Sequence, residues 1–254
     1  MRKYITIFTQ VKKNDIQKEP YLLPSTGDLL RKVSFFSGLS DAVLSKFERI
    51  AMVQSFQSEE TIMLGGDARR TVFFIAKGQA RVFYDAKKSR NNLLNLLDAG
   101  DFFGEIQLFS ENAKSSISLK AESQCTVIIF KGKDFINEIK NYPELLLAFL
   151  RETTKKLNKA YAQIAALSMS TIKKRIKSCI MLFMEERGIK ILRKGKAITV
   201  LKNRPTQQQM AEMSGTTRET VNRELANLEK NGYIEMDGGD LVLLKELPMS
   251  DDES

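Results

Sequence analysis

The sequence predicts an α+β fold with a β-rich N-terminal domain, a long central helix and a helical C-terminal domain. Short runs of β-branched and aromatic residues, separated by glycines, fill the first half of the chain. A leucine and isoleucine stripe follows, and two short amphipathic helices with capping signals lie near the C-terminus. With 254 residues, of which 43% are hydrophobic, the chain is large enough for two buried cores.

The first 27 residues are predicted to form an N-terminal tail, because Pro20 and Pro24 interrupt any regular element there. The basic residues near the N-terminus are not followed by a sustained apolar segment or a small-residue cleavage site, so no signal peptide is predicted. No apolar run approaches the roughly 18 residues of a membrane span. We therefore expect a soluble protein without a membrane partner.

The composition excludes several kinds of chemistry. Histidine is absent, which removes His-based acid–base catalysis and Ser-His or Cys-His nucleophile pairs. Cys125 and Cys179 are far apart and neither lies in a CxxC motif, so we expect no zinc site and a reducing, cytoplasmic location. We expect a protein that is not an enzyme, with no catalytic residues, no metal site and no required cofactor. The net charge of +9 favours a polyanionic partner such as nucleic acid.

Residues 28–141 are predicted to form a sandwich, barrel or jelly roll, because several short β-type runs follow one another at regular spacing. These runs cover residues 61–64, 71–76, 80–84, 93–97 and 126–130. A helix is predicted over residues 41–51, with Ser40 as its N-cap and Leu44 and Phe47 on its apolar face.

A long helix is predicted from Pro143 to about Leu167, within a segment of residues 142–170 that ends in a hinge. Apolar residues recur along it at close to heptad spacing: Leu146, Leu150, Leu157, Ile164 and Leu167. This pattern is typical of a helix that pairs with its own copy, although a helix buried within one subunit shows the same stripe. We expect a homodimer.

Residues 206–231 predict two short helices around a turn at Ser214-Gly215. Thr206 with Gln209, and Thr216 with Glu219, have the spacing of capping boxes. Gly232 supplies a stop for the second helix. A hairpin signal over residues 233–244 follows, so residues 171–250 are predicted to form a winged helix-turn-helix domain.

The second of these helices has one apolar and one polar face. Val221, Leu225 and Leu228 recur at helical spacing and are predicted to be buried. The residues expected to contact double-stranded DNA are Arg218, Glu219, Asn222, Arg223, Thr206 and Thr217. Arginine can bond guanine O6 and N7 in the major groove, and glutamate can accept from cytosine N4. An isolated helix with these charges is more often simply solvated, but the turn and the hairpin around it favour DNA binding.

The segment before these helices is strongly basic. Residues 171–204 contain eleven Lys or Arg residues and two acidic residues. This bias suits contacts with DNA phosphates and a salt-sensitive affinity.

Residues 28–247 resemble the family of bacterial transcription regulators that contains the cyclic-AMP receptor protein and the fumarate–nitrate regulator. The motifs that carry the resemblance are VSFFSGLS (33–40), FFIAKGQA (73–80), LDAGDFFGEI (97–106) and RETVNR (218–223). The resemblance implies a cyclic-nucleotide-binding-type β jelly roll, a dimerisation helix and a winged helix-turn-helix. It also implies a TGTGA-like palindrome as the DNA site and RNA polymerase as a partner.

The resemblance further implies an effector site that opens with Gly104, Glu105 and Ile106, the start of the family's phosphate-binding cassette. Backbone N–H groups after Gly104 are expected to receive a phosphate. Glu105 is expected to accept a hydrogen bond from a ribose hydroxyl, or alternatively to cap a turn as a structural carboxylate.

This chain departs from the family's pattern for cyclic nucleotides at several positions. The family's phosphate-binding Arg is Ser115 here, within Lys114-Ser115-Ser116, and Lys114 takes its place only if the loop is one residue shorter. The family's adenine-binding Thr-Ser pair is Ala160 and Tyr161. Tyr161 is expected to fill the adenine space from within, leaving a pocket that is degenerate or tuned to another molecule.

We therefore expect a regulator that is independent of an effector or answers a different ligand, with a cyclic nucleotide of unknown identity as one candidate. The alternative is a cyclic-nucleotide-binding regulatory or scaffold protein whose C-terminal helices bind protein. The exposed Arg218 and Arg223 and the basic segment before them argue against this alternative.

Overall fold

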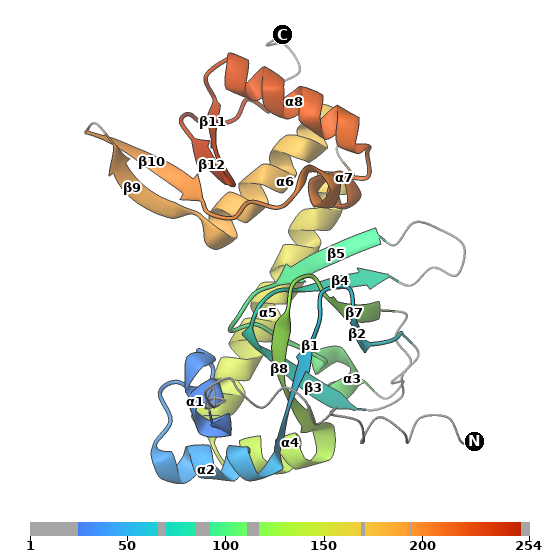
Figure 1. Cartoon of the computed structure of the whole chain (residues 1–254), viewed down its shortest axis with the longest axis vertical. Coiled ribbons are helices and arrows are strands. Elements are labelled where there is room, and N and C mark those ends of the chain that lie inside the picture. The colour runs from blue at the N-terminus through green and yellow to red at the C-terminus, as the bar shows by residue number, and fades with distance from the viewer. Residues whose placement is uncertain are drawn as a thin grey trace, which may run out of the picture.

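The computed structural model describes residues 25–65, 70–84, 92–110, 117–168, 171–193 and 195–249. Figure 1 shows an N-terminal domain and a C-terminal domain, with helix α5 (Pro143–Leu167) running from one to the other. The tail predicted for residues 1–27 lies outside the described residues except for its end. There Ser25 caps helix α1 (Thr26–Lys32) through a capping box with Asp28.

The described part of the N-terminal domain contains two four-stranded antiparallel sheets, which confirms the predicted jelly roll. The first sheet has the order β1 (Ala51–Phe56), β8 (Cys125–Lys131), β3 (Thr71–Lys77) and β6 (Phe102–Phe103). The second has the order β2 (Thr61–Met63), β7 (Ile117–Ala121), β4 (Ala80–Tyr84) and β5 (Asn92–Leu97). Strands β1, β6 and β7 were not predicted from the sequence.

Phenylalanine side chains form the core between the first sheet and the helices that cover it. The helices are α1, α2 (Asp41–Ile50), α4 (Gly132–Ile139) and the start of α5. Phe36 and Phe74 lie with their ring centroids 4.8 Å apart, and Phe102 stacks on Phe149 of α5 at 4.6 Å. Because aromatic packing of this kind adds to the hydrophobic gain of burial, it fixes α5 to the N-terminal domain.

Helix α5 has the bounds that the sequence predicts, and its two faces differ. Leu145, Phe149 and Ala166 are buried against the rest of the chain. The predicted apolar stripe is exposed in the single chain: Leu146, Leu150, Leu157, Ile164 and Leu167. The helix is therefore attached by one side and leaves the near-heptad side uncovered.

The C-terminal domain begins with helix α6 (Ile172–Arg187), followed by a hairpin of β9 (Ile189–Arg193) and β10 (Lys196–Leu201). Helices α7 (Gln207–Ser214) and α8 (Arg218–Lys230) and strands β11 (Ile234–Asp237) and β12 (Asp240–Leu243) complete it. Strands β9 and β10 were not predicted. They join the predicted wing in a sheet of order β11-β12-β10-β9 within the described residues.

Within the part of the chain that the structure describes, no helix combines the length and the apolar character that crossing a membrane requires.

Candidate DNA-binding helices and sensor site

The two predicted helices of the C-terminal domain are present as α7 and α8. Thr206 and Gln209 form the predicted capping box of α7: the Thr206 side chain accepts from the Gln209 N–H, and the Gln209 side chain accepts from the Thr206 N–H. The turn between the helices ends at Gly215, whose φ of 62° lies in the left-handed region that glycine adopts without strain.

The capping box predicted for α8 is wrong. Its N-cap is Thr217, which accepts from the Thr220 N–H at 3.3 Å, and not Thr216. The Thr216 N–H instead donates to the carbonyl of Ala211 at 2.9 Å and completes the end of α7. Because Thr216 still belongs to the end of the first helix, the second helix begins one residue later.

Helix α8 separates its apolar and polar residues as predicted. Val221, Leu225 and Leu228 are buried in the core of the C-terminal domain. The polar face carries four exposed residues: Arg218, Glu219, Asn222 and Arg223. Gln207 of α7 donates to the Asn222 side-chain oxygen at 2.9 Å, which links the polar ends of the two helices.

An open groove of about 580 Å³ connects the N-terminus of α7, the start of α8 and the turn of the β11–β12 hairpin. Its lining residues are Arg204, Thr206, Gln207, Gln208, Arg218 and Gly239. Burial lowers the pKa of Arg204, and its Nε has no hydrogen-bond partner among the described residues. A groove with two arginines and a helix N-terminus suits an anionic group such as a phosphate.

Several side chains of the basic segment 171–204 are engaged within the chain, so the segment is not a uniform phosphate-binding surface. Lys177 is buried and donates to the carbonyl of Pro248 at 2.8 Å. Arg193 forms a bidentate pair with Glu235 at about 3 Å. Arg187 faces the N-terminal domain, where it contacts Asp98.

In the N-terminal domain, the sequence-predicted effector residues Gly104 and Glu105 lie where β6 leads into the short helix α3 (Glu105–Phe109). Gly104 has a φ of 106°, and a Cβ there would lie 2.1 Å from the Thr71 carbonyl oxygen. Only glycine fits this position, and it places the Glu105 side chain in the interior, 9% exposed. Ile106 is exposed.

Lys156 of α5 contacts the Glu105 carboxylate, a relationship that the sequence analysis missed. Its Nζ lies 3.2 Å from Glu105 Oε2, donates to the Phe102 carbonyl and lies 3.7 Å from the Phe102 ring centroid. Burial lowers the pKa of Lys156, and the neighbouring carboxylate of Glu105 opposes this effect. The Glu105 carboxylate therefore has a cationic partner from within the chain.

Of the other predicted effector residues, the structure describes only Tyr161. Lys114, Ser115 and Ser116 lie outside the described residues. Tyr161 is 61% exposed and lies on the same side of α5 as Leu157 and Ile164. The Tyr161 side chain is thus largely uncovered in the single chain, and its assignment to the adenine space stays a prediction.

The two thiols are buried, and burial raises the pKa of both Cys125 and Cys179 to about 11. Thiols with such pKa values are poor nucleophiles near neutral pH. Among the described residues, no three His, Cys, Asp or Glu side chains are grouped so that they could hold a metal ion.

Comparison with protein families gives a match to each domain. A model of the cyclic nucleotide-binding domain matches residues 53–142, and a model of the Crp-like helix-turn-helix domain matches residues 179–248. The cAMP-activated global transcriptional regulator CRP of Haemophilus influenzae is 26% identical over 203 residues, which are 80% of this chain and 88% of that protein. The CRP-like cAMP-activated global transcriptional regulator of Mycobacterium tuberculosis is 22% identical over 216 residues, 85% of this chain and 94% of that protein.

Solved structures share the fold. A CooA mutant from Carboxydothermus hydrogenoformans has a TM-score of 0.67 at 20% identity, covering 82% of this chain and 87% of that one. The c-di-GMP responsive global regulator CLP from Xanthomonas campestris has a TM-score of 0.62 at 18% identity, covering 81% of this chain and 100% of that one.

Proposed function

Because the chain belongs to the CRP/FNR family of DNA-binding transcription regulators, we propose that it acts as a homodimer on a TGTGA-like palindrome, with a sensor altered from the cyclic-AMP pattern. The observation that carries this proposal is helix α8. Its apolar face is buried in the domain, while Arg218, Glu219 and Arg223 are exposed beside an open groove. Base-reading helices require this arrangement, since only exposed side chains can reach base edges.

The proposed DNA contacts are of two kinds, to base edges and to the phosphate backbone. Arg218, Glu219 and Arg223 read base edges in the major groove, and Asn222 adjusts their preference. Thr206 and Thr217 cap α7 and α8, and the first turns of the two helices are proposed to face the phosphates of the DNA backbone. Arg204, which the sequence analysis did not single out, adds a cation to the same groove.

The homodimer is proposed on the exposed stripe of α5. Leu157 is 50% exposed and Ile164 is 63% exposed, and the apolar residues recur at the spacing of a coiled-coil seam. A second copy of α5 would cover this stripe. It would also place two α8 helices on one palindrome, as a two-fold axis requires.

The altered sensor is proposed on two observations. Ser115 stands where the family's phosphate-binding Arg is expected, and the Glu105 carboxylate is paired with Lys156. A cyclic nucleotide would have to compete with this pair for Glu105, so we propose that the protein binds DNA without cyclic AMP or answers another ligand. As a family member it is further proposed to act on transcription through RNA polymerase.

The test is binding of the purified full-length protein to a labelled TGTGA-type palindrome, followed by fluorescence anisotropy at several salt concentrations. The titration is repeated with cyclic AMP, cyclic GMP and cyclic di-GMP. We expect specific, salt-dependent binding that micromolar cyclic AMP does not strengthen. A saturable rise in affinity with cyclic AMP would refute the altered sensor, and absence of any specific binding would refute the DNA-binding assignment to this palindrome.

A further inference from the structure

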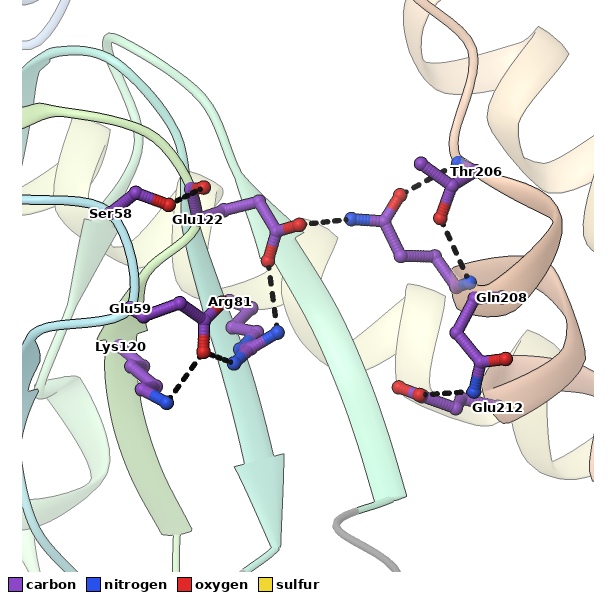
Figure 2. Close-up of polar contacts among 9 residues, drawn as sticks. Ser58, Glu59, Arg81, Lys120, Glu122, Thr206, Gln208 and Glu212 are labelled. Atoms are coloured by element: carbon purple, nitrogen blue, oxygen red, sulfur yellow. Dashed lines mark hydrogen bonds and ion pairs between the residues drawn. The ribbon is translucent and has the colours of Figure 1, made fainter.

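A glutamate of the N-terminal domain bonds the first helix of the DNA-binding pair. Glu122 lies in the turn between β7 and β8, and its Oε1 accepts a hydrogen bond from Gln209 Nε2 of α7 at 2.9 Å. Figure 2 shows the Glu122 side chain reaching from the sheet toward the start of α7, where Thr206 lies. The residues are 87 positions apart in the sequence, so the contact depends on how the domains are docked.

The Gln209 side chain forms one hydrogen bond within its own domain and one with the N-terminal domain. Its amide oxygen accepts from the Thr206 N–H at 2.7 Å and so completes the capping box that starts α7. Its amide nitrogen donates to Glu122. The side chain is 9% exposed, and a buried amide keeps its hydrogen-bond partners because losing one leaves a polar group unsatisfied.

Glu122 is held in place by its own domain. Arg81 NH1 lies 3.3 Å from Glu122 Oε2, and Arg81 NH2 lies 2.6 Å from Glu59 Oε2, which Lys120 also contacts at 2.7 Å. Ser58 Oγ donates to the Glu122 carbonyl at 2.9 Å. Figure 2 shows Arg81 and Lys120 on the neighbouring strands β4 and β7, with Ser58, Glu59 and Glu122 in the turns beside them. These contacts hold the Glu122 carboxylate in place on the side away from α7.

A second contact joins the domains at the end of α6. Arg187 NH1 lies 2.9 Å from Asp98 Oδ2, and Arg187 NH2 donates to the Leu96 carbonyl at 2.8 Å. A cavity of about 300 Å³ lies between the domains, and both Glu122 and Arg187 line it. The Arg187 side chain is 19% exposed and the Asp98 side chain is 41% exposed, so the arginine is largely covered while water reaches the carboxylate.

The docked arrangement places a negative charge beside the proposed DNA surface. The interdomain cavity and the groove expected to meet phosphates share Arg204, Thr206 and Gly239. The N-terminus of a helix favours anions, which makes the start of α7 a site where a DNA phosphate would be stabilised. The Glu122 carboxylate is hydrogen-bonded to Gln209 in the first turn of α7. It would therefore repel a phosphate that approaches this turn, because both groups are negatively charged.

The contact at Asp98 also lies close in sequence to the sensor site. The Asp98 N–H donates to Asp101 Oδ2 at 2.8 Å, and the next residue, Phe102, offers its carbonyl to Lys156. Residues 98–105 thus include both Asp98, which pairs with Arg187, and Glu105 of the sensor site. A ligand that displaced Lys156 from Glu105 would move the segment on which the interdomain ion pair depends.

We propose that the Glu122–Gln209 hydrogen bond and the Arg187–Asp98 ion pair hold the DNA-binding domain docked on the sensor of the same chain in an autoinhibited state. Release of this docking is then the regulated step. This inference rests on the proposed DNA-binding function. Linkage requires the reverse effect as well, so DNA binding must weaken the contact between Glu122 and Gln209.

The test compares Glu122→Ala with Glu59→Ala in the full-length protein. Both variants remove one carboxylate from the same charged cluster, but only Glu122 contacts α7. We expect Glu122→Ala to bind the palindrome about 5- to 10-fold more tightly than wild type, at the low end of typical allosteric couplings. Glu59→Ala should change affinity less than about twofold, as expected for an exposed ion pair.

Hydrogen–deuterium exchange of the α7 amides gives a readout that does not need DNA. Glu122→Ala should speed exchange in α7 and Glu59→Ala should not. If Glu122→Ala binds DNA no more tightly than wild type, or if α7 exchange is unchanged, the autoinhibitory contact is refuted. If wild type and both variants all fail to bind specific DNA while α7 exchange responds to Glu122→Ala, the docking stands and the proposed DNA-binding function fails.

Discussion

Lys156 Nζ lies 3.2 Å from Glu105 Oε2, so a cation from α5 neutralises the carboxylate at the start of α3. Lys156 side-chain exposure is 24% and that of Glu105 is 10%, and the lysine also donates to the Phe102 carbonyl. One pair therefore ties the long helix to the loop that, in the family pattern, opens the effector site.

Replacing Lys156 by Met should destabilise the fold by about 1–3 kcal/mol, because it leaves the Glu105 carboxylate and the Phe102 carbonyl buried without their donor. Urea unfolding followed by circular dichroism measures the loss. The control is Lys155→Met, whose pair with Glu152 is exposed and should contribute less than about 0.5 kcal/mol. Equal losses in the two variants would contradict the role assigned to the buried pair.

Gly104→Ala should cost at least about 2 kcal/mol, because an L-residue is strained at a φ of 106° and the new methyl would clash with the Thr71 carbonyl oxygen. Thermal unfolding provides the measurement. Gly38→Ala is the matched control, since nothing among the described atoms lies within 4 Å of its Cβ position. That variant should stay within about 0.5 kcal/mol of wild type, and a similar cost at both sites would exclude the steric explanation.

Asp101→Asn should change how stability depends on pH. Burial raises the pKa of Asp101 above its usual value of 3.8, although Lys156 and Arg187 oppose this effect. The Asp101 carboxyl therefore holds its proton more tightly in the native state than in the unfolded state. The stability that protonated Asp101 contributes is lost as the pH rises through the raised pKa.

The asparagine does not titrate and can still accept from the Asp98 N–H, which donates to Asp101 Oδ2 in wild type. The unfolding free energy of the variant minus that of wild type should thus grow as the pH rises above the usual pKa of 3.8, and it should level off once the pH has passed the raised pKa. Urea titrations across this range measure the difference. A constant difference would show that Asp101 has the same pKa in the folded and unfolded states.

Leu157→Glu should disrupt the dimer, because it would place a charge within the proposed seam of two α5 helices. An unpaired buried charge costs several kcal/mol, so the dissociation constant should rise at least about 100-fold. Sedimentation equilibrium measures it. Asn158→Glu introduces the same side chain at the next exposed position and should leave the dimer intact. If Leu157→Glu and wild type have the same mass, the stripe is not the dimer interface.

Arg223→Ala should lose about 1–3 kcal/mol of discrimination between the palindrome and a base-substituted duplex. Arg223 is exposed on the polar face of α8. Lys230→Ala removes the same charge from the last turn of the helix and should weaken binding to both duplexes alike. Competition anisotropy with the two duplexes separates these outcomes. Equal affinity of wild type and Arg223→Ala for the palindrome would remove Arg223 from the base-reading residues.

The elements that the sequence predicted well are those with strong local signals. The apolar positions of α8, the glycine turn before it and the stripe on α5 all follow from spacing within one segment. The N-cap of α8 was misplaced by one residue because Thr216 and Thr217 are chemically equivalent there. The choice between them depends on the bond from the Thr216 N–H to Ala211 that ends α7.

What the sequence did not predict depends on tertiary contacts. All five residues of β9 are exposed, so the strand has no alternation of buried residues that a sequence pattern could reveal. Lys156 and Gln209 occupy helix positions where polar residues are unremarkable. Their partners Glu105 and Glu122 lie 51 and 87 residues away, beyond the reach of any local pattern.

The sheet of the C-terminal domain also has a practical consequence for protein engineering. Strand β10 pairs with both β9 and β12, so trimming the β9–β10 hairpin would leave β12 with an open edge that invites aggregation. The turn at Gly195, by contrast, is exposed and has open space around it. A fluorophore attached there would report on the orientation of the C-terminal domain while leaving α7 and α8 intact.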